Sequence, residues 1–130
     1  MSKASLIIDR VVYLLHEHLN LLEEARRGVA LSRATRGGVV DEVLDSLGKL
    51  RSSRARLLEE IRAIGGLDSL SSGEVEDLIA LLGYYVEVAY ANELSVLLDA
   101  RDIVDVSYDL LDIEGLRREA QSILSRLLSR

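Results

Sequence analysis

The chain has 130 residues, a formal net charge of −6 and no cysteine, proline or phenylalanine. This length suits one domain with a substantial core, and we expect residues 1–130 to form a single helical-bundle domain. The absence of cysteine excludes disulfides, thiolate metal sites and a cysteine nucleophile. The N-terminal segment lacks the uninterrupted apolar region of a signal peptide, and no run of about 18 apolar residues offers a membrane span. We therefore expect a cytoplasmic protein that does not bind a membrane.

The acidic balance argues against a general nucleic-acid binder, because such proteins neutralise phosphates with a basic face. Arginines do gather at two places in the sequence, which are Arg51, Arg54 and Arg56, and Arg117, Arg118, Arg126 and Arg130. We interpret both groups as solvated faces of helices. Abundant aliphatic residues with few aromatic ones favour helices packed by aliphatic side chains over strands.

The first half of the chain predicts two helices that pair as an antiparallel hairpin. Residues 5–27 carry an apolar stripe at helical spacing, namely Ile7, Val11, Leu14, Leu15, Leu22 and Ala25. Gly28 and the Gly37-Gly38 pair indicate the connection that follows. A second helix is expected over residues 40–64, ended by Gly65-Gly66.

The second half predicts two or three more helices. Ser71 with Glu74 three residues later is a capping box that begins a helix ending near Leu82. We expect a break or kink at residues 83–86, since one helix from the capping box to Leu111 would be too long for a compact domain. A long helix over residues 88–111 is expected to follow. Asp112 is the expected N-cap of a last helix. The fold class is therefore all-α, an antiparallel helical bundle of four to five helices.

The histidines and acidic pairs do not predict a metal site. His16 and His18 lie about 200° apart around a helix, so they cannot bind one metal together from that helix. His18 falls on the apolar stripe, where we expect a core or interface histidine with a hydrogen-bonded nitrogen. The pairs Glu23-Glu24 and Glu59-Glu60 lack the Glu-x-x-His spacing of di-iron bundles. We expect neither a metal nor a cofactor, and no serine has a neighbouring base and orienting group in the sequence.

One polar strip stands out in the apolar second half. Arg101, Asp105 and Tyr108 are spaced i, i+4 and i+7, so on one helix they would project from the same side. An intrahelical ion pair between Arg101 and Asp105, with Tyr108 half-buried and its hydroxyl wet, is the structural interpretation of this spacing. A functional strip is the alternative.

The segment Arg101-Asp102-Ile103-Val104-Asp105-Val106-Ser107-Tyr108, followed by Asp112, resembles the Arg-x4-His-x-Tyr segment of HEPN domains, specifically the HepT-like toxin group. The resemblance extends loosely over residues 81–128. It implies a small helical bundle that dimerises and pairs with a minimal nucleotidyltransferase antitoxin. In the family, the Arg and His of both protomers form a metal-independent ribonuclease cleft, and the Tyr accepts adenylyl groups from the partner.

This chain departs from the family pattern at one position. Arg101 and Tyr108 match the family Arg and Tyr, and Asp102 lies where a polar residue usually follows the Arg, but Val106 replaces the His. Valine has no titratable group and cannot act as a general acid or base. The resemblance therefore implies no confirmed catalytic residue and no ribonuclease activity, with Tyr108 as a possible adenylyl acceptor.

Two classes of function remain open from the sequence. The first is a dimeric HEPN-like protein without ribonuclease activity that acts as partner of a minimal nucleotidyltransferase, as in a toxin–antitoxin pair. The second is a helical-bundle assembly or adaptor protein with no nucleotide or RNA role. In both cases protein–protein interaction is expected, and the surplus of apolar residues over residues 88–111 predicts a homodimer with that helix at or near the interface.

Overall fold

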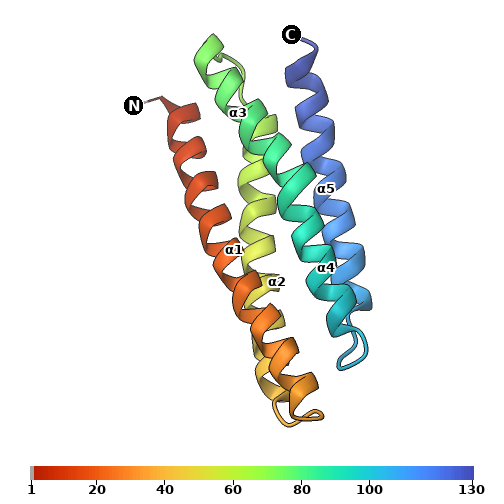
Figure 1. The fold of residues 1–130 in the computed structure, drawn as a ribbon. Helices are drawn as coiled ribbons and strands as arrows, with labels where there is room; N and C mark the ends of the chain where they lie inside the picture. Colours follow the sequence, from red (N-terminus) through yellow and green to blue (C-terminus); the bar gives the residue numbers. More distant parts are fainter. Residues whose placement is uncertain (1) are drawn as a thin grey trace.

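The computed structural model describes residues 2–130, and it confirms an all-α bundle of antiparallel helices (Figure 1). Its elements are α1 (Lys3–Ala34), α2 (Val40–Gly65), α3 (Ser72–Tyr84), the π-helix η1 (Tyr85–Ala89), α4 (Tyr90–Ala100) and α5 (Ser107–Leu128). Since α3, η1 and α4 follow one another without a gap, they form one long rod. Around the bundle, α1 neighbours α2, α2 neighbours α5, α5 neighbours the α3–η1–α4 rod, and that rod closes the ring on α1.

The hairpin of α1 and α2 agrees with the sequence, although α1 is longer than expected. It runs through Gly28 to Ala34, because Val29 and Ser32 continue its buried stripe. The turn that follows contains the two residues with positive φ, Arg36 at 55° and Gly37 at 89°. Glycine adopts that backbone region without steric cost, so the turn depends on Gly37 rather than on Gly28.

The predicted capping box is confirmed at the start of α3. The Ser71 hydroxyl accepts from the Glu74 backbone N–H at 3.2 Å, and the Glu74 carboxylate accepts from the Ser71 backbone N–H at 2.9 Å. The same carboxylate accepts from the Ser2 hydroxyl at 2.6 Å, which ties the start of α1 to the start of α3. These hydrogen bonds lower the pKa of Glu74 from its ordinary value, with the Ser2 contact contributing most.

The expected break at residues 83–86 does not occur, and the helix instead becomes irregular from Tyr85 onward. The helix continues past Gly83, and the backbone changes from α to π geometry at Tyr85 without leaving the rod. A π turn accommodates an extra residue in the helix and leaves its local carbonyls less regularly paired. One of these, the carbonyl of Val86, accepts a hydrogen bond from the Arg117 side chain of α5 at 3.3 Å.

The expected helix over residues 88–111 and the expected N-cap at Asp112 are also wrong. Helix α4 ends at Ala100, residues 101–106 form a connection, and α5 already begins at Ser107. No glycine or proline lies in that connection, so the sequence offered no conventional break there. Asp112 lies inside α5, where it has a different role described below.

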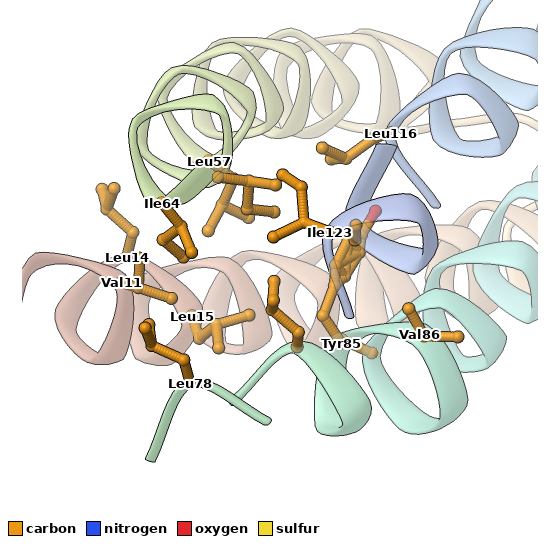
Figure 2. Packing of buried hydrophobic residues seen from close by; sticks show 14 of the residues in the cluster. Val11, Leu14, Leu15, Leu57, Ile64, Leu78, Tyr85, Val86, Leu116 and Ile123 are labelled. Atoms are coloured by element: carbon orange, nitrogen blue, oxygen red, sulfur yellow. The ribbon is translucent and has the colours of Figure 1, made fainter. Parts of the chain in front are cut away.

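The core is divided into two apolar clusters along the bundle axis. The first, shown in Figure 2, joins the start of α1, the end of α2, α3 with η1, and the end of α5. The second joins the end of α1, the start of α2, α4, Val106 and the start of α5. The residues between the clusters are polar, so each cluster buries apolar surface on its own side of a polar layer.

No helix within residues 2–130 combines the length and apolar character that crossing a membrane requires.

Candidate functional site

The strip expected from Arg101, Asp105 and Tyr108 does not form. Arg101 follows the end of α4, Asp105 lies in the connection, and Tyr108 lies in the first turn of α5. Because the chain leaves the helix between the first residue and the last, the i, i+4 and i+7 spacing does not place them on one face. The predicted intrahelical pair between Arg101 and Asp105 is therefore wrong.

Asp105 and Asp102 instead stabilise the connection itself. The Asp105 carboxylate accepts from the Ser107 backbone N–H at 3.0 Å and from the Ser107 hydroxyl at 2.7 Å, which begins α5. These hydrogen bonds lower the pKa of Asp105. Asp102 lies 3.9 Å from Arg33 of α1, and the same guanidinium donates to the carbonyl of Asp99 at the end of α4. The connection is thus tied to the start of α5 through Asp105 and to α1 through Asp102.

Val106, which replaces the histidine of the resembled motif, faces the core. It is only 3% exposed and packs in the second apolar cluster, while its backbone forms the N-cap of α5. A side chain in this position points away from any solvent-filled cleft. Residue 106 therefore contributes packing here and no titratable group.

Tyr108 lies on the surface, with 66% of its area exposed. Its nearest cation is Arg51 of α2, whose guanidinium carbon lies 6.0 Å from the centroid of the ring. Arg51 is itself held by Asp109, which accepts from its Nε at 2.9 Å and from an NH2 group at 2.8 Å. The pair of Tyr108 and Arg51 is a cation–π contact at the limit of its range, oriented by the buried carboxylate beneath it.

A buried polar layer crosses the bundle between the two apolar clusters. We define it by six residues from α1, α2, α4 and α5, namely His18, Ser53, Arg54, Glu93, Asp109 and Asp112. Four of these side chains, those of His18, Arg54, Glu93 and Asp109, are at most 2% exposed. Buried charges on this scale are tolerated only when they are paired and hydrogen-bonded.

Arg54 is the centre of the layer. Its Nε donates to Glu93 Oε2 at 2.8 Å, one terminal nitrogen donates to Asp112 Oδ2 at 2.7 Å, and the other donates to Asp109 Oδ1 at 2.6 Å. Burial alone would lower the pKa of Arg54, but these three carboxylates outweigh it and raise the pKa. Arg54 therefore stays charged and joins three helices.

The acidic side of the layer responds to the same contacts. Burial raises the pKa of Asp109, yet the hydrogen bonds from Arg51 and Arg54 outweigh this and hold the pKa below its ordinary value.

Tyr85, in the neighbouring π-helix, reaches from η1 toward α5 in Figure 2. Its hydroxyl is buried without a hydrogen-bond partner, and burial raises its pKa.

His18 completes the layer on the side of α1. Its Nδ1 lies 2.8 Å from Ser53 Oγ and its Nε2 lies 2.7 Å from Glu93 Oε1. The expectation of a core histidine with a hydrogen-bonded nitrogen is confirmed, since the ring is 2% exposed and both nitrogens are bonded. The structure also brings a serine and a carboxylate to this base, an arrangement that the sequence did not reveal.

Two of the sequence interpretations change because of the layer. Arg54 does not lie on a solvated face, and Asp112 binds Arg54 rather than capping a helix. A signal was present in the sequence, because Arg54 lies between Leu50 and Leu57 on the buried stripe of α2. A charged residue on such a stripe predicts an ion pair in the core.

Two surface grooves flank these residues. One lies between α1 and α2, has a volume of about 350 Å³ and is lined by Glu17, Leu21, Lys49, Ser52, Ser53 and Arg56. The other, of about 450 Å³, lies over η1, α4 and α5, and its lining includes Tyr90, Ala91, Leu94, Leu98 and Arg117. Within residues 2–130, no cluster of histidine, aspartate and glutamate has an arrangement suited to a metal ion.

Comparison of the chain with protein-family models, with curated proteins and with solved structures finds no match.

Proposed function

We propose that the chain is a HEPN-like partner protein of a minimal nucleotidyltransferase, that Tyr108 is its nucleotidyl acceptor, and that it does not cleave RNA. The observation that carries the proposal is the exposure of Tyr108, which leaves two-thirds of the residue open to another protein. The proposed partner, a minimal nucleotidyltransferase, is the one implied by the resemblance of residues 101–108 to the HepT-like segment.

The surroundings of Tyr108 suit the transfer chemistry. The phenolic oxygen would attack the α-phosphorus of ATP, pyrophosphate would leave, and the phenolic proton would pass to a base of the transferase. The product is a phosphodiester with one negative charge. Arg51 beside the ring and the positive end of the α5 dipole both favour an anion at this place.

The arrangement at residues 101–106 supports the proposed lack of ribonuclease activity. Val106 is buried and has no proton to exchange, so the general acid and base steps, which contribute factors of about 10² to 10⁴ each, have no residue there. Arg101 is exposed at the end of α4 and can still bind a phosphate. Binding without an acid or base leaves RNA intact.

Transfer from α-labelled ATP tests the proposal. The proposal requires a minimal nucleotidyltransferase gene beside this chain's gene, and its product should label the wild-type protein and fail to label Tyr108→Phe. Tyr13→Phe is the matched control, since Tyr13 lies on α1 and is 63% exposed. Label that persists in Tyr108→Phe, or the absence of such a neighbouring gene, would contradict the proposal.

A second candidate function, assembly through apolar helix surface, is favoured by the face of the α3–η1–α4 rod. Exposed residues within α4 recur at intervals of four and three, namely Ala91, Ser95 and Leu98, and Tyr84 and Val88 are exposed on the turns before them. This is the spacing of a helix that packs against another helix. Small residues at the middle of the face permit close approach, so we propose that a second copy of the chain pairs with this face to form the homodimer.

A further inference from the structure

Ser53, His18 and Glu93 form a hydrogen-bonded row that runs through three helices. Glu93 Oε2 accepts from Arg54 Nε at 2.8 Å, and Glu93 Oε1 lies 2.7 Å from His18 Nε2. Since a carboxylate oxygen acts as the acceptor, we assign the ring hydrogen of His18 to Nε2. With this tautomer, Nδ1 has the free lone pair that can accept from the Ser53 hydroxyl at 2.8 Å.

This order is that of an activated serine. A hydroxyl donates to an imidazole, and the imidazole is oriented by a carboxylate on its other nitrogen. Here the hydroxyl meets Nδ1 and the carboxylate meets Nε2. Either nitrogen of a neutral imidazole accepts a proton when the other one carries the hydrogen. A histidine that faces the serine with Nδ1 can therefore act as a base just as one that faces it with Nε2.

Ser53 also has access to solvent. It lines the groove between α1 and α2 and is 7% exposed, and its hydroxyl lies 2.8 Å from His18 Nδ1. The groove has a volume of about 350 Å³, which suits a small acyl group. Without this opening the row would be sealed in the core.

The rim of the groove carries two cations. Lys49 and Arg56 both line it, with side chains 52% and 63% exposed. Each has an exposed carboxylate partner, since Lys49 lies 3.5 Å from Asp45 and Arg56 lies 3.9 Å from Glu17, which also lines the groove. Such exposed pairs are weak, so either cation is free to turn toward negative charge that develops above Ser53.

We propose that Ser53 is a nucleophile, activated by His18 and Glu93, that accepts the acyl group of small carboxylic esters in the α1–α2 groove. Ser53 Oγ bonds to the carbonyl carbon while its proton passes to His18 Nδ1. The ester C–O bond then breaks, and the leaving oxygen takes that proton. Water, activated by His18 in the same way, releases the carboxylic acid and restores Ser53. This activity is independent of Tyr108 and of the proposed partner.

A fluorophosphonate probe tests the proposal on the intact chain, because it reacts with activated serine hydroxyls and loses fluoride. Intact mass and peptide mapping should show one adduct, on Ser53, in the wild-type protein and in Tyr108→Phe. Ser53→Ala should give no adduct. Ser52→Ala is the matched control and should react like the wild type, since Ser52 lines the same groove but has no histidine partner.

His18→Gln separates activation from mere accessibility. Glutamine keeps hydrogen-bonding groups in the layer but cannot take up a proton, so the labelling rate should fall by about 10²-fold. The two serine variants each remove only a hydroxyl, and they decide the proposal even where His18→Gln does not fold. A wild-type chain that stays unlabelled, an adduct on Ser52, or equal labelling of Ser53→Ala would overturn it.

Discussion

Asp109 shows at the scale of one residue how the bundle holds charge in its core. It has no exposed surface, and its carboxylate accepts from Arg51 on one side and Arg54 on the other. Arg54 is buried and shares its donors among Asp109, Glu93 and Asp112, whereas the side chain of Arg51 is 43% exposed. Asp109 therefore supplies one of the three carboxylates that compensate the buried cation of Arg54.

Asp109→Asn keeps the volume of the side chain and removes its charge. Because Arg54 then loses one of its buried carboxylate partners, we expect the free energy of unfolding to fall by about 3 kcal/mol, measured by urea denaturation. Glu119→Gln is the control, since Glu119 pairs with Arg62 on the surface and its loss should change little. An unchanged denaturation midpoint for Asp109→Asn would show that the layer does not stabilise the fold.

The same carboxylate predicts how stability depends on pH. Its pKa in the folded chain is below the unfolded value of about 3.9, so its contribution to stability is fully present above that value and is lost as the pH falls from there through the lower folded pKa. We expect urea denaturation to show a loss of stability from about pH 5 to pH 3, with a shallower loss in Asp109→Asn. Equal slopes would assign the effect to surface carboxylates such as Glu74 and Asp105, whose pKa values are also lowered.

At the scale of the element, the π-helix is the irregular part of the long rod. Its hydrogen bonds join residues five apart, so η1 holds one residue more than an α-helix of the same number of turns. Deletion of the exposed Val88 should convert η1 to α-helix and leave the faces of α3 and α4 in place. Deletion of the exposed Ser95 should rotate the end of α4 by about 100° and carry Leu97 and Ala100 out of the core.

Thermal unfolding followed by circular dichroism checks this pair of deletions. The Val88 deletion should retain a cooperative transition and the Ser95 deletion should lose it. Both variants remove one solvent-facing residue from the same rod. A difference between them therefore reports whether the buried faces of α3 and α4 stay aligned. A Val88 deletion that abolishes folding would mean that the π geometry itself positions the polar layer.

The sequence predicted the elements that have local signals and failed where the signals are tertiary. The capping box at Ser71 and the turn at Gly37 were visible because single residue types determine them. The end of α4 was missed because Ile103, Val104 and Val106 continue an apolar pattern. They are β-branched, which lowers helix propensity, and Asp105 supplies the contact that begins α5.

The polar layer could be predicted only in part for a related reason. His18 was recognised as a core residue from its place on a stripe, but its partners come from α2 and α4. Sequence spacing within one helix relates residues three or four positions apart, whereas Ser53 and Glu93 lie 35 and 75 positions from His18. The row of Ser53, His18 and Glu93 therefore could not be predicted without knowing how the helices pack.

At the scale of the whole molecule, the exposed face of the α3–η1–α4 rod predicts the oligomeric state. Light scattering at micromolar concentration should show a homodimer of the wild-type chain, and Leu98→Glu should convert it to a monomer by placing a charge on the face. Leu44→Glu is the control, since Leu44 is similarly exposed but lies on α2. A monomeric wild type, or a dimer that Leu98→Glu does not affect, would remove this face as the interface.

Tyr108 is the residue on which the proposed role as partner of a nucleotidyltransferase most depends. The direct measurement is the intact mass and peptide map of the chain after co-expression with a minimal nucleotidyltransferase, the class of partner that we propose. We expect a mass increase corresponding to added adenylyl groups, mapped to the peptide that contains Tyr108, together with full-length RNA after incubation with the purified chain. An unmodified chain beside an active transferase, or cleavage of RNA by the wild-type chain, would contradict the account.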